Sequence, residues 1–204
     1  IAVADGMGGA AAGEIASGLA VEAATAAPPS DQDLSKRITA GNQAVLDAVE
    51  RDQGLVGMGT TLTMVVLDAE GVAHFGHVGD SRAYLLRGES LRQLTHDHTY
   101  VMELVARGQI SPDDAETHPR RHLLTRVIGM DHVTVDSFDE PLEPGDRLML
   151  CSDGLTGMVD DASIATLLRE AASPAEAVWA LVEAANAGGG VDNTTVAVVD
   201  VLPA

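Results

Sequence analysis

The pattern of apolar and polar positions divides the chain into helical and extended stretches. In the helical stretches, apolar residues recur at three- and four-residue steps or alanine dominates, and a proline or glycine follows. Helices are predicted over 14–27, 34–51, 163–172 and 174–187. Ser173 precedes the last of these, and Glu176 three residues later predicts a capping box.

The extended stretches are β-branched and apolar, and turn residues bound them. Strands are predicted over 1–4, 60–67, 72–78, 82–86, 133–138, 147–151 and 194–201. The links at 68–71 and 79–81 are too short for the crossover that parallel strands need, so neighbouring strands should pair antiparallel. The order, one strand, two helices, several strands, two helices and one strand, predicts an α+β fold with helices covering antiparallel sheets.

Residues from about 95 to 125 are irregular, polar and rich in histidine. A short helix is predicted over 101–107, ending at Gly108, and a second starts with Ser111 as N-cap followed by Pro112. This stretch is interpreted as a flap over a site, and a plain surface excursion is the alternative.

Composition narrows the class of protein. The 204 residues suit one large domain or two small ones, and the formal charge of −19 argues against binding to nucleic acid or to an anionic membrane. Cys151 is the single cysteine, so the chain forms no internal disulfide and no all-cysteine zinc site. No apolar run approaches the roughly 20 residues that span a bilayer. Because Ile1 falls inside a predicted strand, we expect the chain to be a fragment whose beginning is missing.

Four aspartates stand where an apolar strand meets a tight turn that contains glycine: Asp5, Asp80, Asp153 and Asp192. Any one of them alone is explained as a turn residue. Ends of strands at one edge of a sandwich lie close together, so four carboxylates there would repel one another, and the chain has a single lysine, Lys36. Mg²⁺ or Mn²⁺, which prefer oxygen ligands, are the natural compensation.

Two such ions about 3.5–4 Å apart can activate a shared water for hydrolysis without a protein nucleophile. Other nucleophiles fail on inspection: a cysteine phosphatase needs arginine six positions after Cys151, where Gly157 stands. The serine elbow is broken at Ala83, and a phosphate-binding loop with its Gly-Lys pair is absent. His96 and His98 are interpreted as loop residues, because no further histidines stand at a zinc-binding spacing.

One alternative stays open at this point. Residues 6–11 fit the dinucleotide pattern GxGxxA after a strand, but Asp5 at the mouth of that turn would repel a pyrophosphate.

The segments VADGMGG, GMGTTLT, HVGDSRAYLLR, LTHDHTYV, HPRRHLLTRVIG, LMLCSDGL and GGGVDNTTVAVV follow one another along the chain. In this order they resemble the metal-dependent protein phosphatases of type 2C, particularly the bacterial branch, over residues 1 to about 201. The resemblance implies an antiparallel β-sandwich flanked by helices, with a flap subdomain, in a single domain over 1–204. It also implies removal of phosphate from phosphoserine and phosphothreonine.

By this resemblance, Asp5 would bridge two Mn²⁺ or Mg²⁺ ions, with Gly6 giving a carbonyl and Asp153 and Asp192 completing the pair. Asp80 would belong to a third ion that bacterial members often bind, with Asp153 shared. Thr60 and Thr61 would be structural. The expected partners are phosphorylated Ser/Thr proteins and a cognate kinase, and the expected location is the cytoplasm, as an enzyme or as the cytoplasmic domain of a larger protein.

Two departures from the family pattern motivate a rival hypothesis. The chain lacks the opening strand whose arginine grips phosphate in bacterial members, and Ala10 stands where a histidine commonly follows DGMGG. His118 and His122 are candidate substitutes for that histidine, with solvated surface histidines as the favoured interpretation. The rival is a pseudophosphatase that binds phosphoproteins without turnover, although retention of all four aspartates weighs against it.

Overall fold

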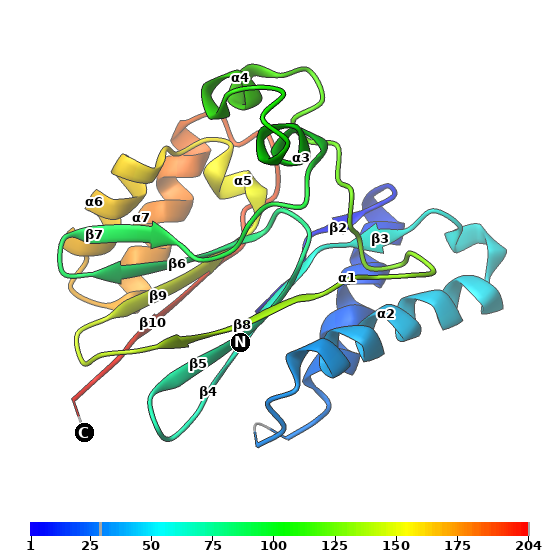
Figure 1. Ribbon diagram of the computed structural model, residues 1–204, viewed down its shortest axis with the longest axis horizontal. Coiled ribbons are helices and arrows are strands. Elements are labelled where there is room, and N and C mark those ends of the chain that lie inside the picture. The colour runs from blue at the N-terminus through cyan, green and yellow to red at the C-terminus, as the bar shows by residue number, and fades with distance from the viewer. Residues whose placement is uncertain (29, 204) are drawn as a thin grey trace.

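The computed structural model describes residues 1–28 and 30–203, with residue 10 described by its backbone alone. Two four-stranded sheets lie face to face between two groups of helices (Figure 1). The first sheet has the order β1 (Ala2–Val3), β4 (Leu62–Leu67), β5 (Val72–Val78) and β8 (Asp136–Pro141). The second has the order β10 (Val196–Asp200), β9 (Arg147–Cys151), β6 (Arg82–Arg87) and β7 (Ser90–Gln93). A small pair, β2 (Gly6–Met7) and β3 (Gly59–Thr60), stands at one end.

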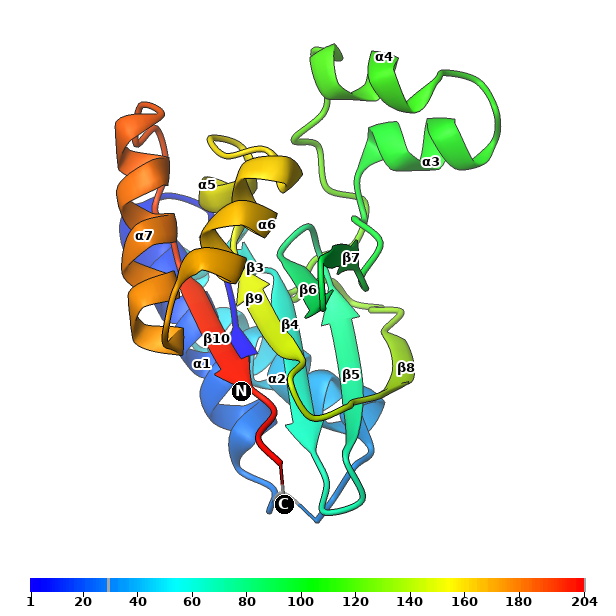
Figure 2. The same cartoon turned by 90° about the vertical axis from the view of Figure 1, so that its left-hand side faces the viewer.

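The helices cover the outer faces of the sheets. The first sheet is covered by α1 (Ala10–Thr25) and α2 (Leu34–Arg51), and a 3-10 turn, η1 (Gln53–Leu55), follows α2. The second sheet is covered by α5 (Asp153–Thr156), α6 (Asp161–Glu170) and α7 (Pro174–Ala187). Two further helices, α3 (Tyr100–Ala106) and α4 (Pro112–Thr117), stand beyond the end of the sheets, as Figure 2 shows.

Three apolar layers result, and the two-residue period of the strands builds them. In β4, Leu62, Met64 and Val66 pack toward α1 and α2, whereas Val65 packs between the sheets. The inter-sheet layer also contains the stacked rings of Phe75 and Phe138, whose centroids are 4.9 Å apart. Strands buried on both faces read as continuous apolar runs, which is why the central strands were predictable.

The far end of the first sheet is held by a histidine between two carboxylates. His74 Nδ1 lies 2.8 Å from Asp139 Oδ1, and its Nε2 lies 3.0 Å from Asp68 Oδ2. Asp68 also accepts hydrogen bonds from the backbone N–H groups of Glu70 and Val72. The β4–β5 turn is therefore fixed to β8.

Most predicted elements are confirmed, and every strand pair named above is antiparallel. The opening helix starts at Ala10 rather than 14 and ends at Thr25, and the strand predicted over 133–138 lies at Asp136–Pro141. The stretch 60–67 divides at Thr61, which bonds to Asp5 instead of continuing one ladder. No helix in the described ranges combines the length and the apolar character that crossing a bilayer requires.

The predicted capping box at Ser173 is only half right. The Ser173 hydroxyl accepts a hydrogen bond from the Glu176 backbone N–H at 3.2 Å, but the Glu176 carboxylate bonds to the Ala172 N–H instead of returning to Ser173. In α4, by contrast, the predicted start with Ser111 as N-cap and Pro112 next is confirmed. Ser111 and Asp114 form a complete capping box there.

Candidate metal site

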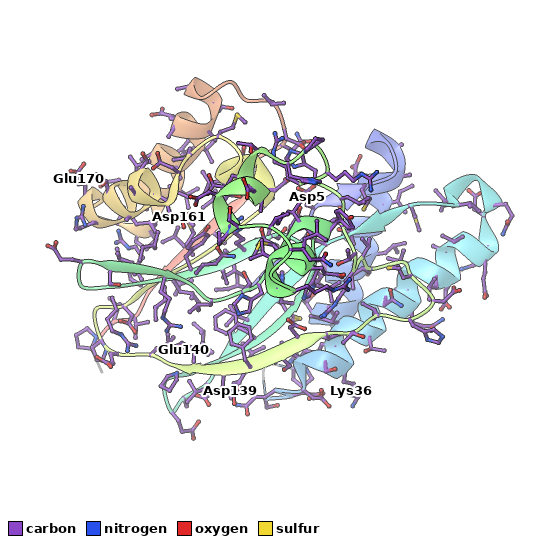
Figure 3. All side chains as sticks on the ribbon, turned by 45° about the horizontal axis from the view of Figure 1, so that its top comes forward. Asp5, Lys36, Asp139, Glu140, Asp161 and Glu170 are labelled. Carbon is purple, nitrogen blue, oxygen red and sulfur yellow. The ribbon has the colours of Figure 1, made fainter. Side chains whose placement is uncertain are left out.

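The four aspartates come from four separate connections at one end of the sandwich. Asp5 lies between β1 and β2, and Asp80 lies in the turn between β5 and β6. Asp153 is the first residue of α5, directly after β9, and Asp192 lies in the loop before β10. Asp5 is labelled in Figure 3.

The pKa of Asp5 reflects both its burial and the other three aspartates nearby. Burial, followed by the charge and a hydrogen bond of Asp153 and the charges of Asp192 and Asp80, raises the pKa of Asp5 to about 7. Burial and the charge of Asp153 raise the pKa of Asp80 to about 7 as well, with Arg82 opposing. Neighbouring like charges disfavour ionisation in this way when no cation compensates them. The four aspartates thus lie at one end of the sandwich, near enough for the charges of the other three to act on Asp5.

Close backbone approach brings Asp153 to Asp192. A Cβ on Gly154 would lie 2.2 Å from the carbonyl oxygen of Asn193, so only glycine lets α5 start against this loop. Ser152 joins the same two segments: its N–H donates to Thr195 O at 3.0 Å, and its hydroxyl accepts from Thr195 N at 3.1 Å.

A second close approach joins Asp5 to Asp80. The N–H of Thr61 donates to Asp5 O, and the Thr61 hydroxyl accepts from Asp5 N, both at 2.9 Å. That hydroxyl also lies 2.8 Å from the Ser81 hydroxyl. Gly79, with φ +113°, passes so close that a Cβ would lie 2.5 Å from the Thr61 side chain. Thr61 thus holds the backbone on both sides of the cluster, which is a structural role.

Gly6 lies directly after Asp5, is exposed, and pairs with Thr60 across the β2–β3 ladder. The resemblance implies that the backbone carbonyl of Gly6 binds a metal ion, and this needs no side chain.

Within the described residues, no three His, Cys, Asp or Glu side chains are gathered tightly enough to enclose one ion. This arrangement fits hard divalent ions, because Mg²⁺ keeps several of its waters and binds through one or two carboxylates. It does not fit zinc, which takes four close ligands and prefers nitrogen and sulfur. The mutual repulsion recorded in the raised pKa of Asp5 is the second sign that a cation belongs there.

His96 and His98 are loop residues, as predicted; of the two histidines expected to be solvated, His122 is exposed but His118 is half-buried. His98 is buried and accepts a hydrogen bond from Gly79 N at 3.1 Å. His118 Nδ1 accepts from Arg120 N at 3.1 Å, and His122 is exposed. Ala10 is the first residue of α1, and its side chain lies outside the described part.

Sequence reasoning missed an ion-pair network beside Asp80. Arg82 donates to both oxygens of Asp97, at 2.7 to 3.1 Å, and to the hydroxyl of Tyr84 at 3.0 Å. The Tyr84 hydroxyl in turn donates to Asp161 in α6 at 3.0 Å. The signal for it was an arginine at the start of a strand that is otherwise apolar, with Asp97 between the two histidines.

A profile of the protein phosphatase 2C family matches residues 1–186. The chain belongs to this family. The antiparallel sheets exclude the dinucleotide fold that GxGxxA suggested, since that fold is built on a parallel sheet.

Named relatives cover nearly the whole chain. It is 40% identical to the serine/threonine phosphatase stp of Listeria innocua, over an alignment of 211 positions that covers 98% of this chain and 83% of that protein. It is 42% identical to the serine/threonine protein phosphatase PstP of Mycobacterium tuberculosis, covering 99% of this chain but 40% of that longer protein.

Solved structures agree with the fold. The crystal structure of the M. tuberculosis phosphatase PstP/Ppp matches with a TM-score of 0.93 at 41% identity, covering 99% of this chain and 88% of the other. The PstP catalytic domain in complex with two manganese ions matches with a TM-score of 0.90 at 40% identity, covering 99% and 87%.

Proposed function

We propose that this chain is a Mg²⁺- or Mn²⁺-dependent serine/threonine protein phosphatase that hydrolyses phosphoserine and phosphothreonine in proteins. One observation carries the proposal: four carboxylates from four connections come together at one end of a phosphatase 2C fold, where burial and the charges of neighbouring aspartates raise the pKa values of Asp5 and Asp80 to about 7. The names of relatives at about 40% identity favour this activity over the pseudophosphatase.

The proposed roles follow the positions of the ligands. Asp5, which feels the charge of all three other aspartates, is assigned to both ions of a pair, with the Gly6 carbonyl beside it. Asp153 and Asp192, joined by the Gly154 contact, complete the pair. Asp80 and Asp153 are assigned to a third ion, because burial and then the charge of Asp153 raise the pKa of Asp80.

When bound, such ions lower the pKa of a shared water and neutralise charge on the phosphate. The contribution of the chain is to hold its carboxylates in register through Thr61, Ser152 and the two glycine contacts. No serine or cysteine of the chain is required as nucleophile. Cys151 is fully buried, and burial raises the pKa of its thiol to about 12, which keeps it un-ionised at neutral pH.

Partners and location follow from the activity. The expected partners are phosphorylated Ser/Thr proteins and a Ser/Thr kinase that produces them, and we place the enzyme in the cytoplasm, where such kinases find ATP. The flap, about 95–125, is proposed as part of a single catalytic domain over 1–204.

The test is release of phosphate from p-nitrophenyl phosphate and from a phosphothreonine peptide, with and without Mn²⁺. Activity should require Mn²⁺ and fall by at least about 10³-fold in Asp153→Asn, because a neutral amide removes charge from both proposed ion positions. The control is Asp131→Asn at an exposed loop position, which should behave as wild type. Full activity in Asp153→Asn would refute the mechanism, whereas peptide binding in chelator without turnover in Mn²⁺ would favour the pseudophosphatase.

A further inference from the structure

Positive charge is scarce in this chain, and most of its lysines and arginines form ion pairs. Against 31 acidic residues there are 12 lysines and arginines. Ion pairs join Lys36 to Asp31, Arg82 to Asp97, Arg87 to Glu143 and Asp146, Arg92 to Glu140, Arg107 to Glu103, Arg126 to Asp136, and Arg147 to Asp200.

Several arginines form no ion pair within the described residues, and two of these stand side by side in the flap sequence HPRRH, residues 118–122, here called the arginine turn. Arg120 and Arg121 are adjacent and exposed, and within the described ranges neither guanidinium has an acidic partner. The stretch 118–126 contains three arginines and two histidines and no acidic residue. It is thus a positively charged segment in a strongly acidic protein.

The arginine turn has a defined shape. The backbone N–H of Arg121 donates to His118 O at 3.1 Å, and that of Leu123 donates to Arg120 O at 3.1 Å. The guanidinium carbon of Arg120 lies 5.7 Å from the centroid of the Tyr100 ring. A guanidinium packed against an aromatic face keeps its in-plane N–H donors available for an anion.

Short connections tie the arginine turn to the metal site. Tyr100 N–H donates to Leu123 O at 2.8 Å, which fixes the turn to the start of α3. Two residues earlier, His98 exchanges hydrogen bonds with Gly79, the neighbour of Asp80. The path from Arg121 to Asp80 consists of two legs of two residues, each at most about 7 Å long, two hydrogen bonds and one further residue, so the arginine turn lies within the length of a short extended peptide from the site.

We propose that Arg120 and Arg121 recognise negative charge next to the phosphorylated residue of the substrate, so that the enzyme prefers phosphopeptides with acidic flanks. The inference rests on the phosphatase function proposed above. The shared chemistry is a carboxylate or a second phosphate, both of which match the planar fork of arginine. The acidic remainder of the surface repels such a peptide elsewhere and leaves this as the attractive position.

The test compares three phosphothreonine peptides, one with neutral flanks, one with Asp and Glu flanks, and one with a second phosphothreonine, together with p-nitrophenyl phosphate. In Arg120→Gln/Arg121→Gln, kcat/KM for both acidic peptides should fall about three- to tenfold, as expected for two exposed charge contacts. The values for the neutral peptide and for p-nitrophenyl phosphate should not change.

Two matched variants sharpen the result. Arg169→Gln, which removes an exposed arginine of α6 that also lacks an acidic partner among the described residues, should leave all four substrates unaffected. Arg120→Lys/Arg121→Lys keeps the charge but loses the fork, and should retain part of the preference for carboxylates and less for the second phosphate. A preference confined to the doubly phosphorylated peptide assigns the site to phosphate.

Equal losses on neutral and acidic peptides, or no preference in the wild type, would overturn the inference. If the wild type hydrolyses nothing, the proposed function fails by itself, and binding of fluorescent peptides to Asp153→Asn with and without the double Gln change then decides the inference. Tighter binding of acidic than neutral peptides that disappears with the double change supports it, and equal binding overturns it.

Discussion

Replacement of His98 is the sharpest test of how the flap is joined to the metal site. The side chain is 5% exposed, and its two nitrogens face different neighbours. Nδ1 accepts from Gly79 N at 3.1 Å, so in the neutral ring the proton is on Nε2, 3.1 Å from Asp136 Oδ2. Burial lowers the pKa of His98, which keeps the ring neutral at pH 7 and preserves the acceptor.

The amide oxygen of asparagine can occupy the position of Nδ1, whereas glutamine reaches the position of Nε2. His98→Gln therefore leaves the buried Gly79 N–H without a partner, at a cost of about 1–3 kcal/mol. His98→Asn keeps that bond. Like glutamine it loses the ring that packs on His77, and it also loses the Nε2 contacts with Asp136 and Arg126, which still pair with each other at 2.7 Å, so about 1 kcal/mol is expected. His98→Ala loses both, together with the packing on the His77 ring 4.7 Å away, and should cost about 2–4 kcal/mol.

The assay is urea unfolding at pH 7.5 in EDTA, with exposed His132→Asn as the control. The expected order of stability is wild type, Asn, Gln, Ala. If glutamine is the better replacement, or if asparagine is no better than alanine, then the bond from Gly79 does not hold the Asp80 turn and the reasoning is refuted.

Three further predictions concern the site and the far end of the sheet. Gly154→Ala should displace the loop that carries Asp192 and lower kcat/KM for p-nitrophenyl phosphate about 10²-fold, and a fully active variant would contradict this. The control is Gly18→Ala, which has open space around it and should leave activity unchanged while stabilising α1 by about 0.5–1 kcal/mol. Because the pKa of Asp5 is raised in the folded state, the metal-free protein should lose stability as the pH rises from about 4 to about 7. Mn²⁺ should therefore raise the Tm more at about pH 7.5 than at about pH 5.5, and an equal rise at both pH values would argue against ions at these carboxylates. Burial opposes protonation of His74, but hydrogen bonds to its two carboxylates outweigh burial and raise its pKa. The contribution of His74 to the stability of the fold is therefore full below about pH 6.5 and is lost at higher pH. In urea unfolding, His74→Gln should be less stable than the wild type at about pH 6, and this difference should shrink toward about pH 8.5.

Helices and central strands were predictable where the spacing of apolar residues and the turn residues that bound the segment agree. The bounds of 34–51, 72–78, 147–151 and 174–187 are those of the structure, since each is a strongly patterned run that ends at a turn. The edge strands were not predictable in the same way. Ser90–Gln93 was missed because a polar edge strand is defined by its partner, and β8 alternates polar residues with Phe138 under the control of its pairing with β5.

For the site, the sequence predicted which carboxylates meet but not what holds them. Convergence of Asp5, Asp80, Asp153 and Asp192 followed from their common position at strand ends. The bonds of Thr61 and Ser152 could not be foreseen, because each joins segments far apart in the chain, and a buried hydroxyl has no pattern of its own. The short helix α5 was missed because a single turn carries no periodicity.

The site spans both halves of the sandwich: Asp5 follows a strand of the first sheet, whereas Asp153 and Asp192 flank strands of the second. The thickness of the layer between the sheets, set by side chains such as Phe75 and Leu148, therefore fixes how far apart the two sets of ligands stand. That buried layer therefore sets the separation of the two groups of aspartates. A change of volume there should alter the distance between the proposed ion positions, and with it the choice between Mg²⁺ and the larger Mn²⁺, without replacing any of the proposed ligands.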